Sequence, residues 1–299
     1  MRLRRSELST PGSDSHMMEK AVASNADLVL LDLEDAVAPN EKVAARQKVI
    51  ASLRTLDWGK KTRAVRINDL QTEYAYQDII TVVEAAGDSL DIIIVPKVRS
   101  ARDVWWVETL LNQIEIHRGF TRRIGLEVLI EEVEAMLEVE AIARASSRLE
   151  ALIFGPGDYS ASQGIDSRGI DGNLDGYPSD LWHYARNKIV IAARAAGIDA
   201  IDGAYPDFKN KTGYQRECLR AKTLGFAGKW AIHPGQLDIA NQIFSPTAEE
   251  VAYARRLDAA YTQALEQGRG AIAFEGKMVD AAIVRSVKNS IQKADLIGM

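Results

Sequence analysis

One acid, Asp158, stands directly after an apolar run that ends in a glycine-rich turn. The run, residues 151–154, reads Ala-Leu-Ile-Phe and does not alternate with polar residues, which is typical of a parallel strand buried on both faces. Gly155-Pro156-Gly157 suits a tight turn rather than a continued strand. Because enzymes with parallel strands place catalytic groups at the carboxyl ends of those strands, Asp158 is a candidate for chemistry. The alternative is that Asp158 caps the following helix.

A second acid, Glu131, ends the preceding apolar run, residues 124–130. If the two runs are adjacent strands, the carboxylates of Glu131 and Asp158 are neighbours and suit Mg²⁺, which prefers a few carboxylates and leaves positions for substrate oxygens. Mn²⁺ is the expected substitute. Zinc is disfavoured because none of the four histidines is spaced as a zinc motif. The alternative for Glu131 is a solvated acid at a helix start, in the run Glu131-Glu132-Val133-Glu134.

Three basic groups follow other apolar runs. Arg66 is the expected anion anchor, because a guanidinium binds carboxylates and developing enolates through two parallel hydrogen bonds. A structural ion pair between Arg66 and Glu34 or Asp35 is the alternative, and it is compatible with the first role. Lys97 could form a Schiff base, but a salt bridge is favoured for it. His233 could be a base, but a hydrogen-bonded core histidine beside Trp230 is favoured.

The elements that would position these groups form a repeated strand-then-helix pattern. Such alternation predicts parallel strands with right-handed crossovers, and eight units favour a closed (β/α)₈ barrel over an open sheet. Polar groups at the carboxyl ends of the strands are then expected to converge on one mouth, where they need partners, water or a metal. The predicted strands are residues 5–10, 28–33, 63–67, 91–95, 124–130, 151–154, 199–201 and 229–232, and the converging residues are Asp32, Glu34, Asp35, Arg66, Asn68, Lys97, Glu131, Asp158, Asp202 and His233.

The pattern changes after Pro246, which predicts a barrel domain over residues 1–246 and a C-terminal helical extension over residues 247–299. Helices are expected at 248–266 and 279–293, joined by a Gly-rich link at 268–277. Since a barrel does not need this extension, we expect it to pack on a neighbouring subunit of a homo-oligomer and to serve as a lid. The glycines of residues 169–178 lack dinucleotide or P-loop spacing and predict a long loop, which could lie over the mouth.

The composition restricts the class of protein. The 299 residues carry a net charge of −5, so the basic excess expected of a nucleic-acid-binding protein is missing. No apolar run reaches the roughly 18 residues of a membrane span, and the single cysteine excludes an intrachain disulfide. We therefore expect a cytoplasmic protein that binds neither nucleic acid nor membrane.

Taken together, the segments resemble the citrate lyase β-subunit/HpcH aldolase superfamily, and within it the malyl-CoA lyase group. The resemblance runs through nearly the whole chain, and it is the order of the segments that makes it specific. The matching segments are LDLEDAVAP (31–39), VRIN (65–68), VPKV (95–98), LEVLIE (126–131), SSRLEALIFGPGDYSASQG (146–164), IDGAYPDF (201–208), GKWAIHP (228–234) and FEGKMVD (274–280).

This resemblance implies a TIM barrel in which Glu131 and Asp158 bind Mg²⁺ and Arg66 stabilises a substrate enolate. It also implies that Asp280 reaches the active site of an adjacent subunit and exchanges a proton with the enolate carbon. From the sequence alone, Asp280 is only an acid at a helix N-terminus. The implied reaction is reversible cleavage of a 3-hydroxyacyl-CoA such as malyl-CoA to glyoxylate and acetyl-CoA, by a homotrimer or hexamer.

Substrate or CoA contacts are assigned to Arg66, Lys20, Gly157, Asp158, Ile201 and Asp202. For Gly157 and Asp158, the reason is that backbone N–H groups exposed at the turn can bind a carboxylate beside the ion. The first strand and turn depart from the family pattern, which usually has an aromatic residue near the position of Ser9 and often a basic residue or asparagine at that of Asp14. An acid at Asp14 would repel phosphates, although Arg2, Arg4, Arg5 and Lys20 lie nearby in the sequence. A CoA-free aldolase of 4-hydroxy-2-oxo acids, a malyl-CoA thioesterase and a non-catalytic regulatory paralogue are the alternative functions.

Overall fold

The structure is a computed structural model that describes residues 2–165 and 180–299. The loop expected at 169–178 lies outside the described residues. The chain forms two compact units, one of residues Arg4–Asn241 and the other of Gln242–Met299 with the N-terminal residues up to Leu3. The boundary falls inside helix α10 (Leu237–Phe244). Each unit is described by itself.

The first unit is built on a closed barrel of eight parallel strands, which confirms the predicted fold. Each strand pairs with the next along the chain, and β8 pairs with β1. The strands are β1 (Ser6–Pro11), β2 (Leu28–Asp32), β3 (Thr62–Arg66), β4 (Ile92–Val95), β5 (Gly125–Ile130), β6 (Leu149–Phe154), β7 (Asp199–Asp202) and β8 (Gly228–Ala231).

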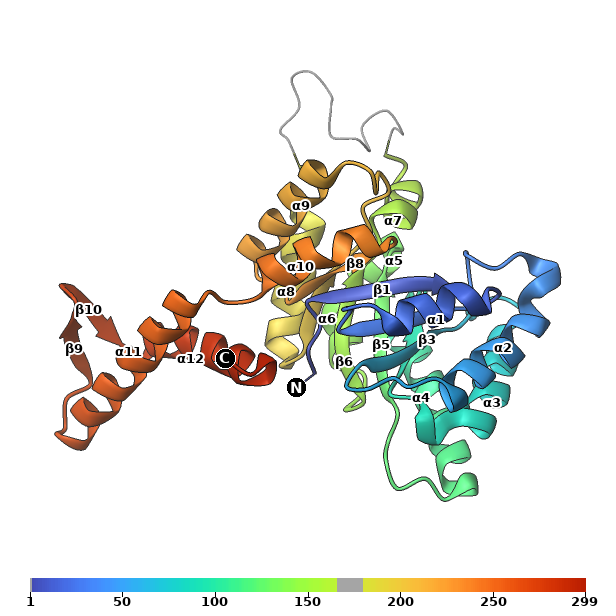
Figure 1. The fold of residues 1–299 in the computed structure, drawn as a ribbon, viewed down its shortest axis with the longest axis horizontal. Coiled ribbons are helices and arrows are strands. Elements are labelled where there is room, and N and C mark those ends of the chain that lie inside the picture. The colour runs from blue at the N-terminus through green and yellow to red at the C-terminus, as the bar shows by residue number, and fades with distance from the viewer. Residues whose placement is uncertain (1, 166–179) are drawn as a thin grey trace. The chain divides into compact units, whose positions relative to one another are not determined.

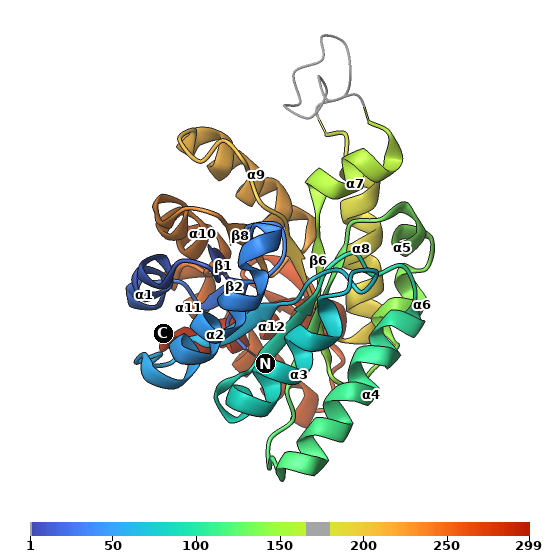
Figure 2. The same ribbon diagram turned by 90° about the vertical axis from the view of Figure 1, so that its right-hand side faces the viewer.

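Helices follow the strands and cover the outside of the barrel, as Figures 1 and 2 show. Consecutive helices pack on one another, among them α2 on α3, α3 on α4 and α8 on α9. The helices of this unit are α1 (Ser15–Ala23), α2 (Lys42–Thr55), α3 (Ala75–Ala86), α4 (Ala101–Arg118), α5 (Val133–Leu137), α6 (Val139–Ala143), α7 (Pro156–Gln163), α8 (His183–Ala196), α9 (Lys211–Leu224) and α10, with short 3-10 turns η1 (Pro39–Glu41), η2 (Gly87–Ser89) and η4 (Pro234–Gln236).

On β2 and β3, the face of the strand that points into the barrel changes from apolar to charged toward the carboxyl end. On β2, Leu28 and Leu30 belong to the interior apolar cluster, and the side chains of their neighbours Val29 and Leu31 are buried as well. This explains why the strands do not alternate in sequence, since both of their faces are covered. The interior face repeats every second residue, so Asp32 follows Leu28 and Leu30 on that face at the carboxyl end of β2. By the same period, Arg66 follows Ala64 on β3.

Three local predictions differ from the structure. The single helix expected at 135–145 is two short helices, α5 and α6, because Glu138 between them leaves helical geometry at φ −104° and ψ 9°. The glycine turn at 155–157 is the start of α7, with Gly155 as N-cap and Pro156 at the first helical position, where its missing N–H costs nothing. The Gly-rich link at 268–277 contains a β-hairpin.

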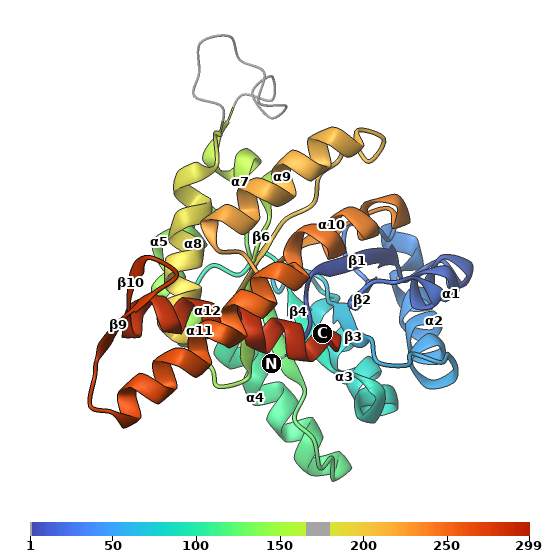
Figure 3. The same ribbon diagram turned by 60° about the vertical axis from the view of Figure 1, so that its left-hand side comes forward.

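That hairpin belongs to the second unit and joins β9 (Ala271–Phe274) to β10 (Lys277–Asp280). Glu275 and Gly276 form its two-residue turn with φ of 46° and 78°, as a tight hairpin requires. Helices α11 (Ala248–Glu266) and α12 (Ala281–Ile297) pack on each other beside it (Figure 3). Among the described residues, no helix is both long and apolar enough to cross a membrane.

Candidate functional site

Arg66 is held at the mouth of the barrel by a carboxylate on the neighbouring strand. Asp32 is the register partner of Arg66 across β2 and β3, and its two oxygens accept hydrogen bonds from Nε at 2.8 Å and Nη2 at 2.6 Å. Although burial opposes it, Asp32 raises the pKa of Arg66 above its usual value, so the guanidinium stays charged. Asp32 accepts from the edge of the guanidinium that carries Nε and Nη2. N–H groups that do not face Asp32 remain on both Nη atoms and can bind another anion.

Glu34 links Arg66 to the second cation of the mouth. One Glu34 oxygen lies 2.7 Å from Nη1 of Arg66, and the other accepts a hydrogen bond of 2.5 Å from the Lys97 ammonium. Burial raises the pKa of Glu34 to about 7, although Arg66 and Lys97 act to lower it. The favoured prediction for Lys97, a salt-bridge partner, is confirmed by its ion pairs with Glu34, Asp35 and Asp158.

Glu131 is a buried carboxylate directly after β5, with only 2% of its surface exposed. One of its oxygens accepts a hydrogen bond of 2.9 Å from the backbone N–H of Lys97, a residue held in the left-handed region at φ 48°. Burial raises the pKa of Glu131 to about 8, and the negative charges of Glu34 and Asp158 add to the effect. A strained backbone at this position is consistent with a site that holds its groups in a fixed arrangement.

Asp158 lies in the first turn of α7 and is partly exposed, with 43% of its side chain accessible. It is 3.7 Å from the Lys97 ammonium and raises the pKa of Glu131 through its charge, so the structure brings Glu131 and Asp158 to one site. The first backbone hydrogen bond of α7 is donated by Tyr159 to Gly155. The N–H groups of Gly157 and Asp158 therefore lie ahead of the helix ladder, in the position where helix N-termini bind anions.

These groups fit a divalent cation. Five carboxylates of the described residues gather around Arg66 and Lys97 at the mouth, and the ammonium of Lys42 interacts with three of them, so the acids exceed the bases. The Glu34 oxygen beside Arg66 is buried without a hydrogen bond. Ionising Glu131 at neutral pH costs free energy, because its pKa is raised to about 8. A cation would offset this excess charge, and carboxylates with space for further oxygens are the ligands that Mg²⁺ prefers. No group of three or more potential ligand side chains occurs in the described chain, so a metal here would need water or substrate oxygens to complete its shell.

Two predicted substrate positions do not offer free side chains to the mouth. Ile201 on β7 is fully buried and packs in the interior apolar cluster. Asp202 is next in sequence and therefore points outward, where Arg186 and Lys229 hold its carboxylate. Although burial acts to raise it, the pKa of Asp202 is lowered by those two cations. The expectation that Asp202 faces the mouth needs correction, because strand alternation places it between the barrel and its helices.

Asn68 and His233 also differ from the expected convergence. The Asn68 side chain accepts a hydrogen bond of 2.5 Å from the Lys42 ammonium and donates one of 2.6 Å to Asp78. Lys42 also donates to the carbonyls of Leu33 and Glu34. This arrangement fixes the loop that carries Glu34. His233 is exposed rather than in the core. Its ring stacks on Phe208 at 4.9 Å and accepts a hydrogen bond from the Gly235 N–H.

Arg4 and Arg5 precede β1 and pair with acids away from the mouth. Arg4 is buried before the start of β1, at the opposite end of the barrel, and pairs with Glu127 and Glu150. Arg5 pairs with Asp27. Asp14 caps α1 by accepting a hydrogen bond from the Met17 N–H. Lys20 is exposed on the same helix.

Asp280 is the N-cap of α12, and its carboxylate accepts hydrogen bonds from the N–H groups of Ala282 at 3.0 Å and Ile283 at 3.2 Å. This confirms the reading of Asp280 as an acid at a helix N-terminus. Asp280 lies in the second unit. That its carboxylate reaches the active site of an adjacent subunit stays a prediction.

Sequence reasoning missed three contacts of the site. The ion pair expected between Arg66 and Glu34 or Asp35 is present, with Nη1 of Arg66 2.7 Å from Glu34 and 3.8 Å from Asp35. The two hydrogen bonds from Arg66 to Asp32 were not expected, because they depend on the register of β2 and β3. Gly155 lies against Glu131, since a Cβ at position 155 would be 2.2 Å from a Glu131 oxygen. Trp230 lies with its ring 5.5 Å from the Arg66 guanidinium. Neither of the last two contacts has a local sequence signal.

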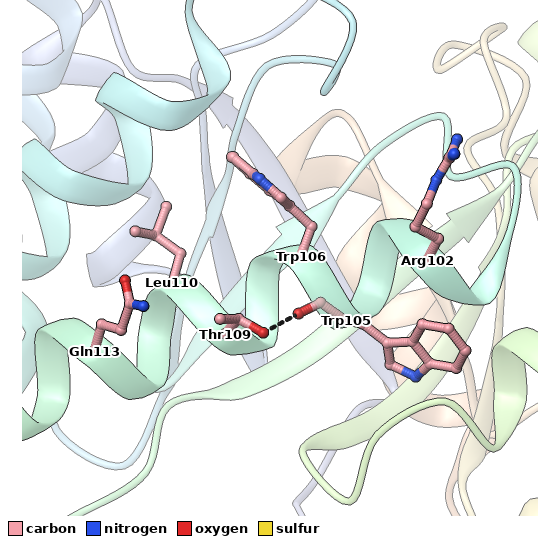
Figure 4. A pocket seen from close by; sticks show the side chains of 6 residues that line it. All are labelled: Arg102, Trp105, Trp106, Thr109, Leu110 and Gln113. Atoms are coloured by element: carbon pink, nitrogen blue, oxygen red, sulfur yellow. Dashed lines mark hydrogen bonds between the residues drawn. The ribbon is translucent and has the colours of Figure 1, made fainter.

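A pocket of about 360 Å³ lies elsewhere, on the outer face of α4 (Figure 4). Its lining comes from this one helix, and the half-exposed rings of Trp105 and Trp106 dominate it. It contains none of the titratable groups of the mouth. Its lining residues are Arg102, Trp105, Trp106, Thr109, Leu110 and Gln113.

Comparison with known proteins agrees with this geometry. Residues 5–234 match the model of the HpcH/HpaI aldolase/citrate lyase family. The L-malyl-CoA/β-methylmalyl-CoA lyase of Cereibacter sphaeroides is 42% identical over 302 residues, which cover 98% of this chain and 95% of that protein. The (3S)-malyl-CoA thioesterase of the same species is 35% identical over 293 residues, with the same coverage.

A solved structure supports the same assignment. CitE of Mycobacterium tuberculosis, in complex with magnesium, acetoacetate and coenzyme A, superposes with a TM-score of 0.75 at 29% identity over 97% of both chains. The family match covers well over half of this chain, and the identity to the lyase extends over nearly all of it. The chain belongs to the HpcH/HpaI aldolase/citrate lyase family of carbon–carbon lyases.

Proposed function

We propose that this enzyme catalyses the Mg²⁺-dependent, reversible cleavage of a malyl-CoA-like 3-hydroxyacyl-CoA to an α-oxo acid such as glyoxylate and acetyl-CoA or a related acyl-CoA. The observation that carries this proposal is the 42% identity to a malyl-CoA lyase over 98% of the chain. The paired carboxylates of Glu131 and Asp158 beside the free donors of Arg66 support it.

Glu131 and Asp158 would hold the magnesium ion, with Mn²⁺ as a substitute. When bound, the ion supplies Lewis-acid polarisation of the oxo-acid carboxylate and carbonyl. The N–H groups of Gly157 and Asp158 at the start of α7 are placed to bind the same carboxylate. Lys97 donates a hydrogen bond to Glu131 from its backbone N–H and another to Glu34 from its ammonium, and so fixes the two carboxylates relative to each other.

Arg66 would contact the oxygens of the bound substrate and would meet the charge of the thioester enolate that leaves when the carbon–carbon bond breaks. Its Nε–Nη2 edge is already fixed by Asp32, so the remaining donors need little reorganisation when charge develops on the substrate. Asp280 would then give a proton to the enolate carbon, or remove one from acetyl-CoA in the condensation direction. In this proposal Asp280 comes from a neighbouring subunit of a homotrimer or hexamer, to which the C-terminal unit brings it.

The test is an assay of purified protein with malyl-CoA, methylmalyl-CoA and citramalyl-CoA, with Mg²⁺ and with EDTA. We expect glyoxylate or pyruvate to appear with an acyl-CoA, in a metal-dependent reaction. Cleavage of none of the three substrates would refute the proposal. For Asp280, mixing Asp280→Ala with Arg66→Ala subunits should restore part of the activity, once subunit exchange has been demonstrated with labelled chains.

A thioesterase acting on malyl-CoA is the second candidate, because the 35% identical relative has that activity. Product analysis separates the two, since a thioesterase releases malate and free CoA without forming glyoxylate. A CoA-free aldolase would instead cleave 4-hydroxy-2-oxo acids, and a non-catalytic regulatory paralogue would cleave neither class.

A further inference from the structure

Arg66 rests against an aromatic ring that is itself fastened by a buried acid. We propose that Trp230, held in place by Glu7, is a positioning residue that orients the Arg66 guanidinium for the reaction. This inference rests on the proposed function, in which Arg66 contacts the substrate.

The pair is formed by two neighbouring strands of the barrel. Glu7 on β1 and Trp230 on β8 are register partners, and the indole N–H of Trp230 donates a hydrogen bond of 2.8 Å to a Glu7 oxygen. Glu7 is fully buried and Trp230 is 6% exposed. Trp230 belongs to the interior apolar cluster, so apolar side chains inside the barrel pack against its ring.

Two restraints then fix the guanidinium in different ways. Asp32 grips one edge of the plane with two hydrogen bonds, which sets the rotation of the group within that plane. The centre of the Trp230 ring lies 5.5 Å from Cζ of Arg66, and the cation–π attraction between them opposes tilting of the guanidinium plane. An orienting contact of this kind matters most where charge develops in the transition state, because a preorganised donor does not have to move.

Glu7 accepts the indole N–H through one of its carboxyl oxygens. Burial raises the pKa of Glu7 well above its usual value, and the charge of Glu127 adds to this, although Arg4 acts to lower it. Its second oxygen is buried without a hydrogen-bond partner among the described residues. A glutamine, which also offers a carbonyl oxygen, is therefore a close substitute, whereas a leucine leaves the indole N–H without an acceptor.

The test compares Trp230→Leu and Trp230→Phe, and Glu7→Leu and Glu7→Gln, with the wild type. We expect Trp230→Leu to lose about tenfold in kcat, with KM changed by less than about threefold, because the ring acts on the transition state more than on binding. Trp230→Phe should recover most of the loss, since it keeps an aromatic face. Glu7→Leu should lose several-fold, and Glu7→Gln should restore what Glu7→Leu loses. The Glu7 pair also serves if Trp230→Leu fails to fold.

The matched control is Trp58→Leu. Trp58 is also buried, and its indole donates to the Ser52 carbonyl, away from the mouth. We expect it to lower the melting temperature without lowering kcat. The proposal is overturned if Trp230→Leu and Glu7→Leu keep kcat within about twofold of the wild type, or if Trp58→Leu loses as much.

Oxalate is a dianion whose second carboxylate carries the kind of negative charge that the substrate acquires only in the transition state, so its binding should depend on the orientation of Arg66 even where KM does not. Oxalate binding in MgCl₂, measured by calorimetry on the same variants, separates this proposal from the proposed function. The wild type could bind oxalate but cleave no acyl-CoA, and the proposed function alone would then fail. In that case, weaker oxalate binding by Trp230→Leu, restored in Trp230→Phe, supports the positioning role. Equal binding in all variants of such an inactive protein overturns the positioning role. A wild type that neither cleaves nor binds overturns both.

Discussion

Replacing Gly155 by alanine should damage the metal site while leaving the barrel folded. A Cβ at this position would lie 2.2 Å from a Glu131 oxygen and 2.6 Å from the Glu131 Cβ. Real Cβ atoms essentially never approach closer than 3.0 Å, so the carboxylate must move by about 0.8 Å, the difference between 3.0 and 2.2 Å. That exceeds the roughly 0.5 Å within which a working site must be held.

The expected size of the effect follows from that shift. Displacing a metal ligand or its supporting group typically lowers metal affinity by about 10- to 100-fold. The crowding costs about 1–3 kcal/mol of folding free energy, and the stiffer unfolded chain returns about 0.4–1 kcal/mol of it. We therefore expect a large loss of Mg²⁺ affinity with a small loss of stability.

The assay is calorimetric Mg²⁺ titration of EDTA-stripped protein, with thermal unfolding recorded beside it. Gly270→Ala is the control for the glycine-to-alanine change, because a Cβ there meets nothing within 4 Å. If Gly155→Ala bound Mg²⁺ as tightly as the wild type and Gly270→Ala, Glu131 would not be a metal ligand and the reasoning would be refuted.

The other predictions concern the charges of the mouth. Because burial and its acidic neighbours raise the pKa of Glu131 to about 8, metal-free protein holds a proton there at neutral pH. Mg²⁺ affinity should then rise as the pH rises toward 8, with about one proton released per ion at pH 7, and titrations in buffers of different ionisation enthalpy would show it; a pH-independent affinity would contradict this. Asp32→Asn removes the carboxylate that accepts two hydrogen bonds from the buried Arg66 guanidinium and leaves Glu34 as the nearest charged partner. It should destabilise the fold by about 3 kcal/mol in denaturant unfolding, whereas the exposed Arg123→Ala should cost under about 1 kcal/mol. Asp158→Ala should abolish Mg²⁺-dependent turnover, and full activity in this variant would show that the metal lies elsewhere.

Much of the fold could be predicted because strands alternate with helices along the chain, and because strands such as β2 and β4 are apolar runs with polar groups at their carboxyl ends. The same reasoning located Arg66, Lys97, Glu131 and Asp158, since groups at the carboxyl ends of parallel strands must share one mouth. It failed for Asp202, where a strand-end acid was taken to face inward without counting the alternation that turns it toward Arg186 and Lys229.

Contacts between distant strands were beyond sequence reasoning. The apposition of Gly155 and Glu131, and of Trp230 and Arg66, depends on how the barrel closes. The pairing of Asp32 with Arg66 depends on register, which a single sequence does not specify. The secondary structure predicted after Pro246 was partly wrong, because the tight turn at Glu275 and Gly276 was taken as part of a Gly-rich link instead of a hairpin.

The most direct test of the central claim is a crystal structure of the protein grown with Mg²⁺ and glyoxylate. The account predicts a cation bound by the carboxylates of Glu131 and Asp158, with the oxo acid on that cation and within hydrogen-bond reach of Arg66. A cation bound away from either carboxylate, or an oxo acid that Arg66 does not reach, would contradict it.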